Sequence, residues 1–193
     1  MFKLFKGRYG EAILPAIAIL TLMVDQVSKH VVLTTLRPGE SWTPLASLGR
    51  WVSITHVTNT GAAFGLFPDQ GLVFIAIAVI VVVIIMVYHR HLPADQWLIK
   101  ISLGLQLGGA LGNLLDRLRS SLAAEGSLLE RLHQAYVVDF IDFKIWPVFN
   151  LADSAIVLGV AILAYYLLLN PSQTEDESSQ VQQGTREEHW VSD

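Results

Sequence analysis

The sequence predicts an all-α membrane protein with four transmembrane helices, and three observations support this fold class. First, 52% of the 193 residues are hydrophobic and only 16% are charged, whereas about a quarter of a soluble domain is charged. Second, seven of the charged residues fall within residues 171–193, which leaves the rest of the chain with even less polar surface. Third, four stretches reach or approach the roughly 20 apolar residues that cross a bilayer. With a net charge of −4, the chain also lacks the basic surface of a nucleic-acid-binding protein, so we expect no nucleic-acid partner.

The first expected span contains Asp25 and Lys29, the second contains no charge, and the fourth is closed by Asn170 and a proline. These spans form one membrane domain, residues 12–170, which follows a basic N-terminus of residues 1–11. The polar and acidic composition of the remaining tail predicts disorder. The expected spans are residues 12–36, 71–88, 97–115 and 154–170, and the tail is residues 171–193.

The orientation follows from the basic residues Lys3, Lys6 and Arg8 ahead of the first span. Basic flanks stay in the cytoplasm, and four spans return the C-terminus to the same side, so both termini are expected there. No small-residue cleavage site follows the first span, which argues against a removable signal peptide. With these three included, six lysines and arginines are expected on each side of the membrane, so the orientation depends on the first helix alone.

The two segments on the outer side, residues 37–70 and 116–150, are long enough to fold. Residues 51–57 are rich in β-branched side chains and predict a strand. The small residues 61–65 suit a close approach of backbones. In the second segment, residues 120–132 predict a short helix with several leucines.

Ionisable residues near the membrane are costly and each needs a reason. Asp25 and Lys29 lie one helical turn apart and predict an internal ion pair, with a polar contact to substrate as the alternative. Asp153 follows Asn150 by three residues, a spacing that by itself predicts a helix-capping box. Asp139 taken alone would be an ordinary loop acid.

Asp139 and Asp153 flank a connection of only 13 residues, which can bring their carboxyl groups together. Two adjacent carboxylates cannot both ionise cheaply, so one keeps its proton as a general acid while the other acts as a general base on water. This pair could hydrolyse an amide. Spacing does not decide between Asp139 and its neighbour Asp142. We expect no metal and no cofactor, because the chain has no cysteine and no His-Glu-x-x-His sequence. The absence of a Gly-x-Ser-x-Gly sequence also argues against a serine hydrolase.

The residues around Gly109 predict close helix packing, and Asn113, Asp116 and Arg117 follow at the outer end of the same helix. At this point the chain resembles a known family, the lipoprotein signal peptidases or signal peptidase II, aspartic proteases of the bacterial plasma membrane. The resemblance rests on five blocks in the family's order: Asp25–Lys29, Asn59–Phe64, Gly108–Arg117, Val137–Ile141 and Phe149–Ser154.

The resemblance implies four transmembrane helices, a small extracytoplasmic β-rich cradle, and a catalytic pair formed by Asp139 and Asp153 at the outer membrane face. The family's other motif positions imply supporting or substrate-binding roles for Asp25, Lys29, Asn59, Gly61, Gly109, Asn113, Arg117, Asn150 and Ala152.

The implied substrates are prolipoproteins that carry diacylglycerol on a cysteine, cleaved just before that cysteine, and globomycin-type inhibitors are expected. Membrane lipids are the other expected partner. One departure is residues 118–136, longer than the short turn usual in the family, which could cap the site or lie on the membrane. The alternatives to a peptidase are a small ion- or proton-coupled transporter, which would use membrane carboxylates, and a structural membrane subunit.

Overall fold

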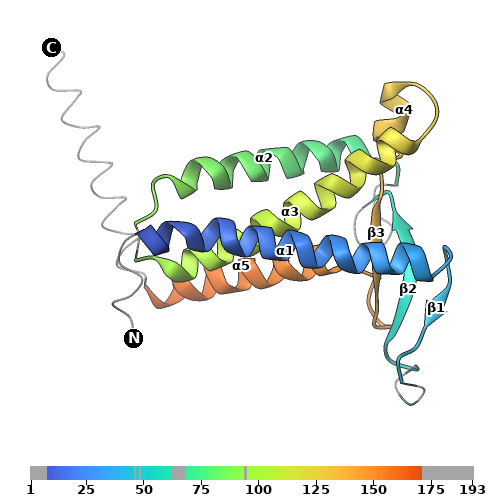
Figure 1. The fold of residues 1–193 in the computed structure, drawn as a ribbon, viewed down its shortest axis with the longest axis horizontal. Helices are drawn as coiled ribbons and strands as arrows, with labels where there is room; N and C mark the ends of the chain where they lie inside the picture. Colours follow the sequence, from blue (N-terminus) through green and yellow to red (C-terminus); the bar gives the residue numbers. More distant parts are fainter. Residues whose placement is uncertain (1–7, 46, 48, 62–67, 94, 171–193) are drawn as a thin grey trace, which may run out of the picture.

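The computed structural model describes residues 8–45, 47, 49–61, 68–93 and 95–170. The expectations for the first seven residues and for the tail from residue 171 lie outside these residues. The described chain forms four long helices, one short helix and a three-stranded sheet at one end of the helical bundle (Figure 1). This arrangement confirms the fold class, a helical membrane protein with a small β-rich region.

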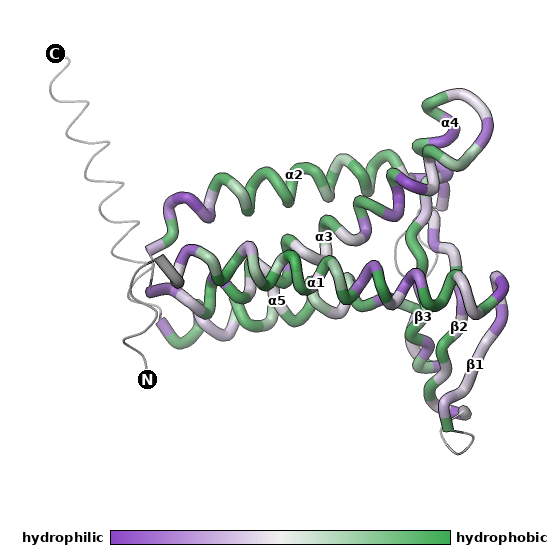
Figure 2. Tube along the Cα trace, viewed as in Figure 1, coloured by the Kyte–Doolittle hydropathy of each residue, from purple (hydrophilic) through white to green (hydrophobic). Residues whose placement is uncertain are grey.

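The four long helices are α1 (Arg8–Thr35), α2 (Gly71–His89), α3 (Trp97–Ala123) and α5 (Leu151–Leu169). Each contains a segment that is long and apolar enough to cross a membrane. Hydrophobic residues dominate α2 and α5, and polar residues gather toward the sheet end of α3 (Figure 2). The chain is therefore a multi-pass membrane protein.

Helix α3 lies at the centre of the bundle and packs against α1, α2 and α5. Its glycines permit this close packing. A Cβ atom at Gly109 would lie 2.5 Å from the carbonyl oxygen of Ala152 on α5, and one at Gly108 would lie 2.6 Å from that of Ala18 on α1. The predicted packing role of these glycines is confirmed.

Several helix boundaries differ from the prediction. Helix α1 begins at Arg8, four residues before the expected start at residue 12. Helix α3 continues to Ala123 rather than ending at residue 115, because the polar residues beyond the apolar stretch still favour a helix. Helix α5 begins at Leu151 rather than at residue 154, because Asn150 caps it. The short helix expected over residues 120–132 was wrong in extent, since its first turn belongs to α3 and only α4 (Leu128–His133) forms separately.

The sheet contains β1 (Ser41–Trp42), β2 (Ser53–Asn59) and β3 (Val137–Asp142) in that order, all antiparallel. Strand β2 confirms the predicted strand, shifted by two residues from the expected 51–57. Strand β3 was not predicted, because five of its six residues are buried and the chain there shows no alternation of polar and apolar side chains.

The register of β2 and β3 places two polar residues on one face of the sheet. Val57 pairs with Asp139 and Asn59 pairs with Val137. Asn59 and Asp139 are therefore diagonal neighbours across the two strands, within reach of each other's side chains. Buried contacts between Val32 of α1 and β3 fix this sheet against the bundle.

Candidate active site

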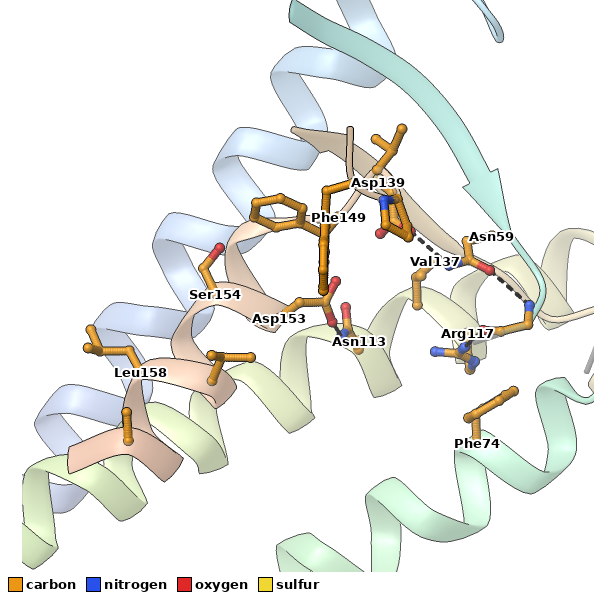
Figure 3. Close-up of a pocket in the computed structure, with 16 residues that line it drawn as sticks. Asn59, Phe74, Asn113, Arg117, Val137, Asp139, Phe149, Asp153, Ser154 and Leu158 are labelled. Carbon is orange, nitrogen blue, oxygen red and sulfur yellow. Dashed lines mark hydrogen bonds between the residues drawn. The ribbon is translucent and has the colours of Figure 1, made fainter. Parts of the chain in front are cut away.

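A cavity of about 830 Å³ lies where β3 meets the ends of α2, α3 and α5 that are nearest the sheet. Polar side chains, among them Asp139 and Asp153, line the end near the sheet, as Figure 3 shows. Apolar side chains of α5, such as Leu158, line the part of the cavity farther from the sheet, and Phe74 of α2 lies beside Arg117. The cavity thus joins a pair of carboxyl groups to an apolar channel between two membrane helices.

The Asp139 carboxyl is 2% exposed and accepts two hydrogen bonds from side-chain amides. Asn59 Nδ2 donates to Oδ2 at 2.9 Å, and Asn150 Nδ2 donates to Oδ1 at 2.7 Å. Burial, followed by the negative charge of Asp153, raises the pKa of Asp139 to about 7, although these two hydrogen bonds and the charge of Lys29 oppose the rise. Asp139 therefore retains a proton in much of the population near neutral pH.

Asp153 lies in the first turn of α5 and has two structural partners. It forms a capping box with Asn150. The backbone amide of Asp153 donates to Asn150 Oδ1 at 3.0 Å, and the backbone amide of Asn150 donates to Asp153 Oδ2 at 3.2 Å. Its other oxygen, Oδ1, accepts from Asn113 Nδ2 at 2.7 Å. The predicted capping box is confirmed, and the same carboxyl group also lines the cavity.

Asn150 connects the two aspartates. Its side chain is fully buried, and besides its bond to Asp139 its Nδ2 also approaches Asn113 Oδ1 at 3.1 Å. One side chain therefore contacts the capping turn of Asp153 and the carboxyl group of Asp139, which fixes their relative position.

Lys29 sets the orientation of the Asn113 amide. Its ammonium group is 2% exposed and contacts Asp25 at 2.9 Å, Asp116 at 2.8 Å and Asn113 Oδ1 at 2.9 Å. An ammonium group can only donate, so the oxygen of Asn113 must face Lys29 and its nitrogen must face Asp153. Asp153 consequently receives a hydrogen-bond donor.

Asp25 forms the predicted ion pair with Lys29 and also holds the start of α5. It is fully buried, and its Oδ1 accepts from the Ala152 amide at 3.0 Å. A Cβ atom at Gly112 would lie 2.5 Å from Asp25 Oδ2, so glycine is needed there to make room. Asp25 is not among the cavity-lining residues, which favours the supporting role over a substrate contact.

Arg117 brings a buried positive charge to the cavity. Its Nη2 donates to the Gly61 carbonyl oxygen at 3.2 Å, and its guanidinium lies 4.9 Å from the centre of the Phe74 ring. The Gly61 amide in turn donates to Asn59 Oδ1 at 3.0 Å. Within the described chain, Arg117 Nε is buried without a hydrogen-bond partner.

Asp142 lies outside the cavity. Lys144 Nζ contacts Asp142 Oδ2 at 2.5 Å, and Thr55 Oγ1 donates to the same atom at 3.0 Å. Partial burial raises the pKa of Asp142, but the hydrogen bonds from Lys144 and Thr55 outweigh it and lower the pKa below its usual value. The structure thus separates the two acids that the sequence left equivalent.

The sequence analysis did not single out Gln26 and Phe74, and it named Asp116 without giving it a role. Gln26 Nε2 donates to Asp116 Oδ1 at 3.0 Å and to Asp25 Oδ2 at 3.1 Å, and Asp116 Oδ2 accepts from the Val138 amide at 3.3 Å. Gln26 is next to Asp25 in the sequence and not one helical turn away, so spacing did not predict their contact. No sequence pattern indicated a role for Phe74.

The structure brings all eleven predicted site residues to one region. Those that line the cavity are Asn59, Gly61, Asn113, Arg117, Asp139 and Asp153. Those that contact or support them from behind are Asp25, Lys29, Gly109, Asn150 and Ala152. No group of three or more histidines and acids among the described residues is placed to hold a metal ion.

Comparison with known proteins identifies relatives of this arrangement. Residues 17–169 match the family model described as signal peptidase (SPase) II. The chain is 48% identical over 153 residues to the lipoprotein signal peptidase of Moorella thermoacetica, a match that covers 79% of this chain and 91% of the relative. It is 40% identical over 152 residues to that of Pelotomaculum thermopropionicum, covering 79% and 89%.

Among solved structures, the fold is similar to a bacterial membrane enzyme determined by the in meso method at 2.3 Å resolution. The TM-score is 0.69 at 28% sequence identity, and the match covers 83% of this chain and 90% of that one. A second bacterial membrane enzyme, determined at 1.9 Å, gives a TM-score of 0.66 at the same identity, with coverage of 81% and 93%.

Proposed function

Because the chain belongs to the signal peptidase II family, which removes the signal peptides of prolipoproteins, we propose that Asp139 and Asp153 are the catalytic pair of an aspartic peptidase. The observation that carries the proposal is the pair of carboxyl groups on one cavity, linked through Asn150. Arg117 and the neighbouring asparagines support the pair, and no cofactor takes part.

The two aspartates divide the proton transfers. Asp153, which accepts a hydrogen bond from Asn113, is the general base that takes a proton from water as the water oxygen attacks the scissile carbonyl carbon. Asp139, whose pKa is about 7, is the general acid that protonates the leaving amide nitrogen as the carbon–nitrogen bond breaks. Transfer of the proton from Asp153 to Asp139 then restores the starting state.

The cavity suits a substrate with a peptide and a lipid part. Its polar end accommodates the scissile bond beside the dyad, and its apolar end along α5 accommodates acyl chains of a diacylglyceryl-modified cysteine. Arg117, which lines this cavity, places a positive charge beside the peptide part of the substrate. Globomycin-type peptides would compete for the same cavity.

The proposed location is the bacterial plasma membrane, with both termini in the cytoplasm and the dyad at the outer face. The basic residues ahead of α1 support this orientation. The dyad then lies where a translocated prolipoprotein would leave the membrane.

The function is tested with purified protein and a purified diacylglyceryl-modified precursor in detergent. Mass spectrometry should find a product that begins at the lipidated cysteine. Asp139→Asn and Asp153→Asn should each reduce turnover at least about a thousandfold, because general acid–base steps contribute about 10²–10⁴-fold each. EDTA should not inhibit.

Asp142→Asn is the matched control, since this neighbouring acid on the same strand lies outside the cavity. We expect it to retain substantial activity. Cleavage by folded Asp139→Asn or Asp153→Asn at more than a small fraction of the wild-type rate would contradict the assignment.

A further inference from the structure

The segment between α3 and β3 carries large exposed apolar side chains away from the active site. Leu122 is 74% exposed, Leu128 65% and Leu129 58%. The structure describes all residues from 118 to 136, and none of them lines the cavity that contains the two aspartates. The segment therefore does not cap the site, and the other alternative, contact with the membrane, is left.

The level of the membrane boundary follows from α2. The chain contains no charge from Gly71 to Tyr88, and the polar residues Asp69 and Gln70 immediately precede this stretch. A helix of this composition crosses the apolar part of the bilayer along its whole length. The start of α2 at Gly71 therefore marks the boundary of the acyl chains on the side of the dyad.

Helix α4 lies at this same level. A Cβ atom at Gly71 would lie 2.5 Å from the carbonyl oxygen of Leu132, 2.6 Å from that of Ala135 and 2.9 Å from that of His133. The end of α4 is thus in direct backbone contact with the start of α2. Figure 1 shows α4 beside the ends of α2 and α3, at the same end of the bundle as the sheet.

The exposure of these leucines resembles that of the membrane-facing side chains of α2. Val73, Ile77 and Ile80 are 47%, 50% and 57% exposed. Leu122, Leu128 and Leu129 are at least as exposed as these side chains and lie on both sides of the connection that contains Gly126, whose φ of +110° turns the chain. Leucines in this position are typical of segments that lie in the membrane interface.

We propose that residues 122–133 form a membrane-interface anchor, in which the three leucines insert into the acyl chains of the leaflet nearest the dyad and the end of α4 holds the start of α2. This proposal depends on the membrane fold and is independent of the catalytic assignment.

The anchor has a consequence for the active site. Helix α2 packs mainly against α3 and α4, and its Phe74 forms part of the cavity wall, under Arg117. Holding Gly71 in place therefore fixes the wall of the cavity that faces α5. The anchor would set the width of the opening through which acyl chains enter.

Because the chain contains no cysteine, single cysteines can be introduced at Leu128 and Leu129 and labelled with an environment-sensitive fluorophore. The full-length protein is placed in vesicles of phosphatidylethanolamine and phosphatidylglycerol. Lipids with a nitroxide on the acyl chain then serve as one quencher and aqueous iodide as the other. Ile80→Cys, exposed in the middle of the apolar helix α2, is the acyl-chain control, and Glu40→Cys, exposed in the turn after α1, is the aqueous control.

We expect the nitroxide lipids to quench labels at Leu128 and Leu129 at least about twofold more strongly than the label at Glu40, as for an apolar face in the interface. Iodide should show the reverse order. Strong quenching by iodide at both leucines would overturn the proposal. Protection from both quenchers would also overturn it, because a protein partner would then cover the leucines.

The holding of α2 is tested with a spin label at Val73→Cys. Replacing Leu128 and Leu129 by aspartate, or by serine if the aspartate variant does not fold, should raise the mobility of this label at least about twofold, since its helix end loses support. A label at Ile84, near the other end of α2, should not change. Equal mobility at Val73 with and without the leucines would refute the holding role.

Discussion

At the scale of single residues, the site depends on asparagines as much as on aspartates. Asn59 and Asn150 donate to Asp139, and Asn113 donates to Asp153. The carboxyl group of Asp153 both caps α5 and lines the cavity. The interpretation of Asp153 as a capping residue therefore does not exclude its interpretation as a catalytic acid. Capping fixes the rotamer of Asp153, and a fixed rotamer is what a general base needs.

The raised pKa of Asp139 predicts a pH-dependent stability. The pKa of Asp139 is about 7 in the folded protein against an ordinary value of 3.8 for an aspartate, so the folded state binds this proton more tightly. Stability contributed by this proton is present below about pH 4 and is lost as pH rises to about 7. Asp139→Asn removes this titration, so its melting temperature in detergent should fall less than that of the wild type between pH 5 and pH 8.

At pH 8 the variant should gain up to about 4 kcal/mol from removal of the buried charge, reduced by about 1 kcal/mol for the hydrogen bond that an amide cannot accept. Asp142→Asn is the control, because the pKa of Asp142 is lowered and its titration lies below this window. Parallel pH curves for wild type and Asp139→Asn would disprove the raised pKa.

The orientation of Asn113 by Lys29 makes a separate prediction. Lys29→Met removes both the donor to Asn113 and a positive charge that lowers the pKa of Asp139. We expect kcat to fall roughly tenfold to a hundredfold, as for loss of a supporting hydrogen bond at about 1.4 kcal/mol per tenfold. The alkaline limb of the pH–rate profile should shift upward, because Asp139 then holds its proton to higher pH.

Lys29→Arg keeps the charge and should restore part of the activity. Lys100→Met is the matched control, since this lysine is 1% exposed on α3 but belongs to the half of that helix away from the dyad. If folded Lys29→Met has the reduced kcat but an unchanged pH–rate profile, Lys29 has only a structural role.

At the scale of elements, the sequence was informative where spacing carries the signal. Apolar length located all four membrane helices, and the i, i+4 spacing of Asp25 and Lys29 and the three-residue spacing of the capping box each gave a correct contact. The strand β3 and the last two turns of α3 were missed. Burial on both faces hides the alternation of a strand, and membrane length gives no signal once a helix leaves the bilayer.

Residues far apart in the sequence were beyond this reasoning. Phe74 meets Arg117, and Gln26 meets Asp116, only through the packing of α2 and α1 on α3. The short connection between Asp139 and Asp153 predicted that their carboxyl groups come together, but only the resemblance to a family chose Asp139 over Asp142. The register of β2 against β3 makes the difference, because it turns Asp139 toward Asn59.

The contact between α3 and α5 supplies a prediction about helix packing. A Cβ at Gly109 would lie 2.5 Å from the Ala152 carbonyl oxygen, and one at Gly159 would lie 2.6 Å from the Ser102 carbonyl oxygen, farther from the dyad on the same helix pair. Gly109→Ala and Gly159→Ala should each destabilise the protein by about 1–3 kcal/mol through overpacking. Thermal unfolding in detergent measures this effect.

Only Gly109→Ala should also lower kcat, because it displaces the turn that carries Asp153 and its cap. A displacement near 1 Å is enough to reduce turnover about a hundredfold. Equal loss of kcat in the two variants at equal stability would show that the position of this turn does not matter for catalysis.

At the scale of the whole molecule, the fold places a polar reaction site at the end of a membrane bundle. The sheet and α4 occupy one end of the four helices, and the dyad lies between that end and the apolar interior (Figure 1). Membership of the signal peptidase II family decides for a peptidase and against the transporter alternative.

This arrangement predicts that cleavage depends on the lipid of the substrate. The cavity of about 830 Å³ continues from the dyad along Val157, Leu158 and Ala161 of α5, so acyl chains can lie against apolar side chains while the peptide stays at the polar end. Each buried methylene contributes about 0.8 kcal/mol, so even six enclosed methylenes would add about 5 kcal/mol to binding. The peptide then mainly fixes the register of the scissile bond, and the lipid supplies most of the affinity.

We therefore expect kcat/KM for a precursor without diacylglycerol to fall at least about a thousandfold below that of the lipidated precursor. The two are compared side by side in the same detergent, and Leu158→Asp should weaken cleavage of the lipidated precursor while leaving the residual cleavage of the other unchanged. Equal rates for both precursors would mean that the apolar end of the cavity plays no part in recognition.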